Sequence, residues 1–154
     1  MLFVYFHSAD RRPLTSLTPS DQDLYHYVYR SAATDGLDWP QVEAIVRRSK
    51  HRNEVFGLTG CLHHEDGLFF QWLEGPRYQL DQIVEKIRRD PRHTDITDLT
   101  YGPLSRRRFS GWTMRSTKGS EASLTQWLTD SDVSTHDRRG YAQSVGAFLA
   151  SFAS

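Results

Sequence analysis

The sequence predicts an α+β fold of the ferredoxin-like βαββαββ type, a mixed five-stranded sheet with two helices on one face, followed by two C-terminal helices. Three observations predict it. Residues 24–31 alternate as a strand does, two later segments carry apolar residues at helical spacing, and Asp66-Gly67 separates two apolar runs as a hairpin turn does. Helix crossovers on both sides of a hairpin place both helices on one side of the sheet.

The first strand and helix follow from local patterns. Strand 24–31 is aromatic and β-branched, and its tyrosines share one face: Tyr25, Tyr27 and Tyr29. Asp38 and Gln41 form a capping box, and Pro40 occupies the first helical turn, where its missing N–H costs nothing. The helix is expected to run to about Lys50, with helical spacing at Val42, Ile45, Val46 and Ser49.

A hairpin and a second helix are expected next. Strands 56–64 and 68–74 lie on either side of the Asp66-Gly67 turn. Gly75-Pro76 ends the second strand and starts a helix that Pro91 terminates. The buried stripe of this helix is formed by Leu80, Ile83, Val84 and Ile87.

Two more strands and two short helices complete the prediction. The strands are expected at 96–101 and 109–114, before a break at Gly119-Ser120. The last helix has an apolar face formed by Tyr141, Val145, Phe148, Leu149 and Phe152. The chain is therefore divided into an apolar segment with a linker (1–23), a central domain (24–115) and a C-terminal helical extension (116–154).

Length and charge limit the possible functions. A chain of 154 residues is one domain by size, and 19 basic residues balance 19 acidic ones, which argues against broad charge-driven binding of nucleic acid. No apolar stretch approaches a membrane span, and the apolar residues 1–6 lack the basic flank of a signal peptide. The single cysteine, Cys61, forms no internal disulfide and suits the reducing cytoplasm, which is the expected location.

The usual signatures of enzymes and metal sites are missing from the sequence. It has no Gly-rich phosphate loop, no nucleophile elbow and no metal-ligand spacing. The neighbours His63 and His64 lie on a predicted strand and should point to opposite faces, so no metal site is expected. Cys61 lies between Gly60 and Leu62 and is interpreted as a small core residue rather than a nucleophile.

One polar side chain stands within an apolar strand. Alternation places Gln71 on the same face as Phe69 and Leu73, and a buried amide needs partners for an acceptor and two donors. The alternative is an edge strand whose glutamine meets water. Two other residues are equally open to a structural interpretation, because Tyr29 fits a core position and Asn53 fits a helix C-cap.

Five segments of the chain, taken together, resemble the BLUF family of flavin photoreceptors across roughly residues 24–115. They occur in the family's order and spacing: Tyr29-Arg30-Ser31, Asn53 with Thr59-Gly60, Asp66-Gly67-Leu68-Phe69-Phe70-Gln71-Trp72-Leu73-Glu74-Gly75, Arg89-Asp90-Pro91-Arg92-His93, and Arg108-Phe109-Ser110-Gly111-Trp112-Thr113-Met114. The Phe-Gln-x-Leu-Glu-Gly core and the Asp-x-Arg-His element are together very specific.

The resemblance implies a blue-light sensor rather than an enzyme, with a non-covalent flavin between the two helices. The flavin is usually FAD in this family, and the sequence does not separate FAD from FMN. Tyr29 matches the electron and proton donor, and Gln71 the amide whose hydrogen bonds rearrange between the tyrosine and the flavin. Asn53 matches the residue bonded to the C4=O and N3–H edge. The other implied flavin contacts are Lys86 and Asp90 on one face of the second helix, and Arg92 and His93 near the ribityl and phosphate end.

The resemblance also implies how the signal leaves the domain. Trp112 and Met114 match the output positions on the fifth strand. No cyclase, phosphodiesterase or DNA-binding module follows, as in short stand-alone members, so we expect an unidentified partner protein to receive the signal and the chain to form a homo-oligomer. The last helix is expected to dock on the open face of the sheet beneath Trp112 and Met114, either only covering it or also forming an interface. Leu2 to Phe6 could add to that surface by pairing with a sheet edge, and the resemblance leaves the role of Arg52 undefined.

Three other functions are compatible with parts of the sequence. An RRM-like nucleic-acid-binding module has a related element order and could stack bases on Tyr25, Tyr27 and Phe69, but the RNP consensus is missing. A small enzyme such as an acylphosphatase needs a phosphate-binding loop, and nothing after Tyr29 resembles one. A BLUF relative that has lost its flavin is disfavoured by the presence of both Tyr29 and Gln71.

Overall fold

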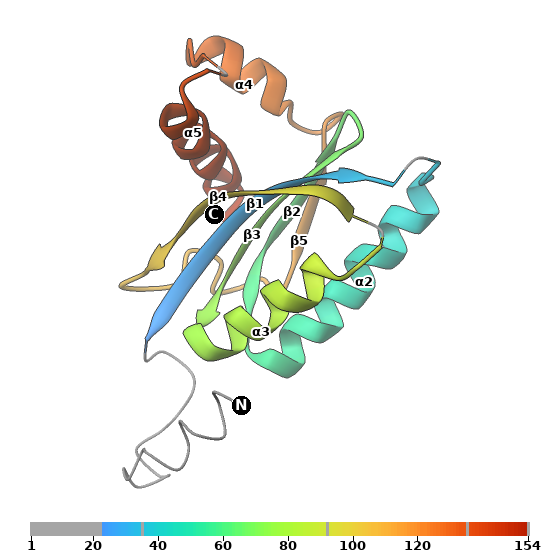
Figure 1. Ribbon diagram of the computed structural model, residues 1–154, viewed down its shortest axis with the longest axis vertical. Helices are drawn as coiled ribbons and strands as arrows, with labels where there is room; N and C mark the ends of the chain where they lie inside the picture. Colours follow the sequence, from blue (N-terminus) through green and yellow to red (C-terminus); the bar gives the residue numbers. More distant parts are fainter. Residues whose placement is uncertain (1–22, 35, 92, 135, 154) are drawn as a thin grey trace, which may run out of the picture.

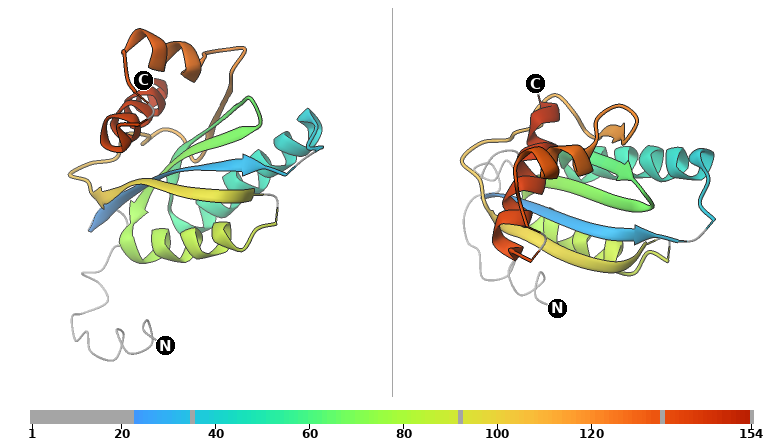
Figure 2. Two further views of the ribbon diagram at one scale, coloured as in Figure 1. Left: turned by 45° about the horizontal axis from the view of Figure 1, so that its top comes forward. Right: turned by 90° about the horizontal axis from the view of Figure 1, so that it is seen from above.

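The computed structural model describes residues 23–34, 36–91, 93–134 and 136–153, so the expectations for Leu2 to Phe6 lie outside it. In the described part, one five-stranded sheet has the order β4-β1-β3-β2-β5. Helices α2 and α3 lie on one face of the sheet, and α4 and α5 lie on the other side (Figures 1 and 2). The elements are β1 (Leu24–Ala33), α2 (Trp39–Phe56), β2 (Thr59–Glu65), β3 (Leu68–Pro76), α3 (Arg77–Arg88), β4 (His93–Pro103), β5 (Arg115–Lys118), α4 (Leu124–Asp130), α5 (Arg138–Ala150) and the short 3₁₀ helix η2 (Ser151–Ala153).

The strand pairing confirms the ferredoxin-like fold. β1 pairs antiparallel with β3 and with β4, while β2 pairs antiparallel with β3 and parallel with β5. The β2–β3 hairpin turns at Asp66 and Gly67, whose φ angles of 51° and 76° are both positive, as a tight two-residue hairpin turn requires. This topology brings β1 and β3 side by side inside the sheet.

Helix α2 begins and ends where its caps require. The Asp38 carboxylate accepts from the Gln41 amide at 3.0 Å, and the Gln41 side chain accepts from the Asp38 amide at 2.8 Å, which is the predicted capping box. The helix continues to Phe56 rather than ending near Lys50, because Gly57 is its left-handed cap, with φ of 69°. Strand β2 consequently begins later than predicted.

The fifth strand is not where the sequence pattern placed it. Residues 109–114 form a loop, and β5 is Arg115–Lys118. The buried carboxylate of Glu74 accepts hydrogen bonds from the amides of Arg108 at 2.9 Å and Phe109 at 2.7 Å, so the loop backbone is bound to a side chain instead of a strand. The aromatic pattern there reflects the burial of Phe109, not a strand.

Each face of the sheet has its own apolar core. The core beneath α2 and α3 consists of Tyr27, Tyr29, Val42, Ile45, Leu58, Leu62, Phe69, Leu73, Leu80, Ile83, Ile87 and Met114. The core beneath α4 and α5 consists of Val28, Cys61, Phe70, Trp72, Phe109, Leu124, Val145, Phe148 and Leu149. Helix α5 therefore docks on the second face, as its apolar stripe predicts. The expected position beneath Met114 is wrong, because Met114 belongs to the opposite core.

Two predictions about side chains of β2 are confirmed. Cys61 is buried in the second core, and burial raises the pKa of its thiol, so it is a core residue. His63 packs against Phe148 with ring centres 4.9 Å apart, and His64 against Phe69 at 5.0 Å, so the two histidines point to opposite faces. Among the described residues, no three His, Cys, Asp or Glu side chains are grouped to hold a metal ion. No helix in these ranges is both long and apolar enough to cross a membrane.

Candidate functional site

Tyr29 and Gln71 form a buried polar pair between the two inner strands. The two residues are opposite each other in the β1–β3 register, on the face covered by α2 and α3. The Tyr29 hydroxyl donates a hydrogen bond to Gln71 Oε1. Tyr29 is 0% exposed and Gln71 2%, so the edge-strand explanation of Gln71 is wrong. The structure thus brings together the two residues that the family resemblance assigned to the photoactive centre.

The surroundings of Tyr29 keep its hydroxyl protonated. Burial raises its pKa far above the ordinary tyrosine value, the Arg52 charge acts in the opposite direction, and Tyr27 and Asp90 add to the increase. Arg52 comes from α2 and Asp90 from the segment after α3, so one charge of each sign acts on this hydroxyl from different parts of the chain. As a neutral phenol, Tyr29 can donate one hydrogen bond, which Gln71 accepts.

The donor end of the Gln71 amide faces a weak acceptor. Its Nε2 lies 3.7 Å from the sulfur of Met114, which is itself buried. Met114, one of the two predicted output residues, therefore contacts the amide directly, although it precedes β5. Trp112, the other, is 39% exposed, and the Arg115 guanidinium lies 4.7 Å from its ring centre. The structure separates the two, burying Met114 and leaving Trp112 at the surface.

One end of the Asn53 side chain is hydrogen-bonded, and the other is a buried acceptor. Its Nδ2 donates to the Thr113 carbonyl at 2.7 Å, which ties α2 to the loop before Met114. Its Oδ1 is buried and has no hydrogen-bond partner among the described residues. Asn53 also lies inside α2, which ends at Phe56, so its interpretation as a C-cap is wrong. A buried acceptor without a partner costs about 1–3 kcal/mol, a cost that a ligand N–H removes.

Of the four other predicted flavin contacts, the structure describes the side chains of two. Lys86 is exposed on the last turn of α3, with its Nζ 5.8 Å from the ring centre of Phe56 on α2. Asp90 does not share a helix face with it, because α3 ends at Arg88. Arg92 and the side chain of His93 lie outside the described residues. Of the two residues expected on this helix, Lys86 therefore lies on it and Asp90 does not.

A buried carboxylate that the sequence interpretation missed positions this site. Glu74 is 0% exposed. Its oxygens accept from the Thr59 hydroxyl at 2.9 Å and the Trp72 indole at 3.0 Å, in addition to the two loop amides that precede Met114. It thereby fixes the loop that delivers Met114 to Gln71. The sequence does contain a signal for Glu74, because it is a polar residue within an apolar strand, as Gln71 is.

Residues 24–115 match the BLUF family, described as sensors of blue-light using FAD. The chain belongs to the BLUF family. BLUF domains are blue-light sensors that bind a flavin, FAD or FMN, and relay a signal to output partners. The alternative of an RRM-like module receives no support. The buried Tyr29–Gln71 pair beneath two helices, with the unmatched acceptor of Asn53, fits a flavin whose edge offers both donors and acceptors.

Relatives and solved structures agree with the family. The chain is 40% identical to photoactivated adenylate cyclase subunit beta of Euglena gracilis over 105 residues, which cover 68% of this chain and 12% of that protein. It is 30% identical to the dark-state structure of BlrB, a BLUF protein, with a TM-score of 0.68, covering 84% of this chain and 99% of that one. It is also 30% identical to Klebsiella pneumoniae BlrP1 with FMN and cyclic diGMP, with a TM-score of 0.61, covering 82% and 34%. The BLUF chain thus spans only a small part of the cyclase subunit.

Proposed function

We propose that this chain senses blue light through a non-covalent FAD held between α2 and α3, and that Tyr29 and Gln71 form its switch. The observation that carries the proposal is the hydrogen bond from the buried Tyr29 hydroxyl to Gln71, in a member of a family of blue-light sensors. A bound flavin supplies the absorption of blue light and, once excited, a strong electron acceptor. Tyr29 would be the donor: its electron would pass to the excited flavin, and its hydroxyl proton would move towards Gln71 along the hydrogen bond that joins the two side chains.

The Gln71 side chain can exchange its hydrogen bonds without gaining or losing an atom. Its amide has a donor at one end and an acceptor at the other, so rotation or tautomerisation exchanges what it offers on each side. In the present arrangement the acceptor end is paired with Tyr29, while the donor end has the Met114 sulfur as its hydrogen-bond partner. An unmatched polar group in a dry site costs about 1–3 kcal/mol, so two pairings of this amide differ enough to define two states.

The choice of FAD over FMN rests on the family and on the expected contacts. The family is described as using FAD, whereas one solved relative is described with FMN. Asn53 supplies an unmatched acceptor for the flavin edge, and Lys86, Asp90, Arg92 and His93 are the proposed contacts towards the other parts of the cofactor. Flavin released by heating and identified by chromatography distinguishes the two, and recovery of FMN alone would refute this part.

We further propose that the output is protein-mediated and that residues 24–115 form the sensor while 116–154 form an extension. The name of the Euglena relative, a cyclase activated by light, supports a sensor that acts on another catalytic unit. The chain itself is proposed to be non-catalytic, cytoplasmic and homo-oligomeric; the single, buried cysteine thiol suits a reducing compartment. A pull-down from cell extract in light and in darkness tests the partner, and light scattering tests the oligomer.

Absorption spectroscopy on three variants tests the switch. The purified chain should be yellow, and blue light should shift its flavin absorption to the red, reversibly. Gln71→Leu should keep the flavin and lose the shift, because no amide remains to re-pair. Tyr29→Phe should keep the fold and also lose the shift. The matched control is Tyr27→Phe, which removes a hydroxyl two residues away on the same face and should keep the shift. A full shift in Gln71→Leu would refute the mechanism.

A further inference from the structure

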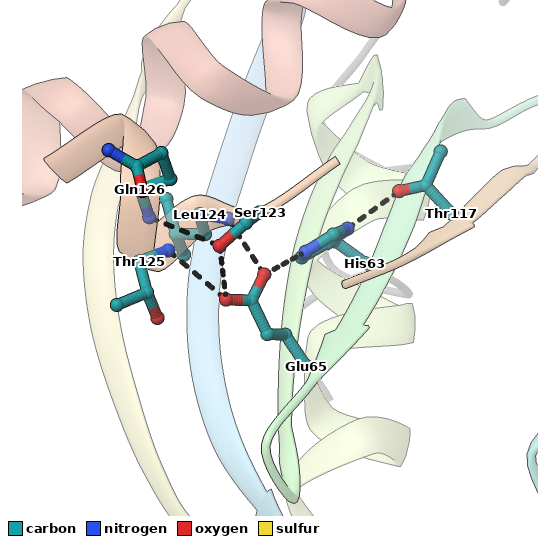
Figure 3. A network of polar contacts seen from close by, with 7 residues as sticks. All are labelled: His63, Glu65, Thr117, Ser123, Leu124, Thr125 and Gln126. Atoms are coloured by element: carbon teal, nitrogen blue, oxygen red, sulfur yellow. Dashed lines mark hydrogen bonds and ion pairs between the residues drawn. The ribbon is translucent and has the colours of Figure 1, made fainter. Parts of the chain in front are cut away.

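A second buried polar group lies on the opposite face of the sheet from Gln71. His63 on β2 is 0% exposed, and its Nε2 lies 2.9 Å from Glu65 Oε1 (Figure 3). On its other side, His63 Nδ1 lies 2.8 Å from the hydroxyl of Thr117 on β5. The ring packs against Phe148 of α5, which places it in the core under the C-terminal helices. This histidine therefore connects β5 with a carboxylate.

Glu65 binds the first turn of α4. Its Oε1 accepts from the Leu124 amide at 2.7 Å, and its Oε2 accepts from the Thr125 amide and the Ser123 hydroxyl, both at 3.1 Å (Figure 3). Ser123 in turn caps the helix at the Gln126 amide. Helix α4 has 7 residues, too few for an isolated helix to be stable, so it depends on these caps and on its packing.

The ionised state of Glu65 follows from its contacts. Burial alone would raise the Glu65 pKa, but the hydrogen bonds from His63 and from the amides of Leu124 and Thr125 outweigh burial and lower it to about 2. Glu65 is therefore a carboxylate and can only accept. His63 must carry a proton on Nε2 to donate to it, while its Nδ1 pairs with the Thr117 hydroxyl. Thr117 on β5, His63 and Glu65 thus form one continuous hydrogen-bonded chain that ends on the first turn of α4.

Strand β5 joins this group to the Gln71 amide. The strand begins directly after Met114, whose sulfur contacts Gln71, and Thr117 lies three residues further on. In the register, Leu62 of β2 is opposite Gln71, while the next residue, His63, is opposite Thr117. β5 has 4 residues and pairs in the described part only with β2, so it can shift against β2 at the cost of few hydrogen bonds. A displacement of Met114 along β5 therefore changes the Thr117–His63 contact.

We propose that His63 and Glu65 are positioning residues that couple β5 to α4, so that re-pairing of Gln71 loosens the first turn of α4. The inference rests on the proposed function, since it requires a light-driven change at Gln71. It assigns the C-terminal helices an output role through hydrogen bonds on the second face of the sheet. In the dark, the Thr117–His63–Glu65 chain holds α4 in place; in the light, the shifted β5 weakens it.

Hydrogen exchange of the α4 amides, measured with the flavin bound in darkness and under blue light, tests the coupling. In the unaltered chain, light should speed exchange in Leu124–Asp130 about fivefold, the factor expected for loss of one ordinary hydrogen bond. Thr117→Val removes the hydroxyl and keeps the side-chain shape. This variant should retain the red shift, exchange faster in the dark, and show no further acceleration in the light. Glu65→Gln should do the same, because an amide cannot accept at both ends.

Matched controls separate coupling from simple loss of stability. Thr129→Val makes the same change on the exposed side of α4, and Glu121→Gln makes the same charge change just before it; both should keep the light response. If Thr117→Val keeps the full light-dependent change in α4, the coupling is refuted even where Glu65→Gln does not fold. A red shift in the unaltered chain without any change in α4 also refutes it. Absence of the red shift itself refutes the proposed function, and the coupling with it.

Discussion

Removing the Tyr29 hydroxyl and the Gln71 amide, first separately and then together, measures how strongly these side chains depend on each other. Both are buried, at 0% and 2% exposed, and the hydroxyl donates to the amide oxygen. Tyr29→Phe leaves the Gln71 oxygen without this donor, and Gln71→Leu leaves the phenol without its acceptor. Each single change should lower the free energy of unfolding by about 1–3 kcal/mol, the cost of a buried polar group without its partner.

The double variant should cost less than the sum of the two single variants. It removes both ends of one hydrogen bond, so the second change no longer leaves a polar group unmatched, and we expect a coupling energy of about 1–2 kcal/mol. In a domain of this size that corresponds to about 2–8 °C in the melting temperature. The assay is denaturant unfolding at one fixed flavin concentration, because a ligand that binds only the folded state adds stability of its own.

A second double-mutant cycle, with Tyr27 in place of Tyr29, provides the control. Tyr27→Phe removes a hydroxyl on the same strand and face, but that hydroxyl donates to Asp98 and not to Gln71. Its effect should add to that of Gln71→Leu within about 0.5 kcal/mol. If the effects of Tyr29→Phe and Gln71→Leu on the free energy of unfolding also add within this margin, the Tyr29–Gln71 hydrogen bond does not stabilise the folded state, and the reasoning is refuted.

Three further predictions concern single residues. The pKa of Glu65 is lowered from 4.5 to about 2, so its contribution to stability is complete above pH 4.5 and is lost as the pH falls from there towards 2. The free energy of unfolding, measured as a function of pH, should show this loss in the unaltered chain and not in Glu65→Gln. Gly60→Ala places a Cβ 1.9 Å from the Trp72 carbonyl oxygen and should reduce stability by several kcal/mol. Gly111→Ala is the control: apart from its chain neighbours no atom lies within 4 Å of the new Cβ, so stability in thermal unfolding should change by less than about 0.5 kcal/mol. Cys61 should react with a thiol reagent only as fast as the chain opens, because it is buried and its thiol pKa is raised; rapid labelling of the native protein would contradict this.

Local patterns determined most of the fold. The capping box at Asp38 and the Asp66-Gly67 turn are fixed by neighbouring residues, and both form as predicted. The apolar stripe of the last helix predicted that it covers the open sheet face, which the second core confirms. The polar Gln71 in an apolar strand and the motifs around it pointed to the photoactive pair. These features depend on contacts within a few residues or on the periodicity of a single element, so a sequence displays them.

The tertiary structure alone decided which polar groups meet. Tyr29 and Gln71 are 42 residues apart, and Glu65 and the Leu124 amide are 59 apart, so both contacts depend on strand register and on how α4 returns to the sheet. The same dependence explains why the strand predicted at 109–114 is a loop, since Glu74 binds the Phe109 amide at its start and Asn53 binds the Thr113 carbonyl near its end. Periodicity tells which face a side chain occupies, but a hydrogen bond needs a partner within about 3 Å, and only the assembled sheet supplies that distance.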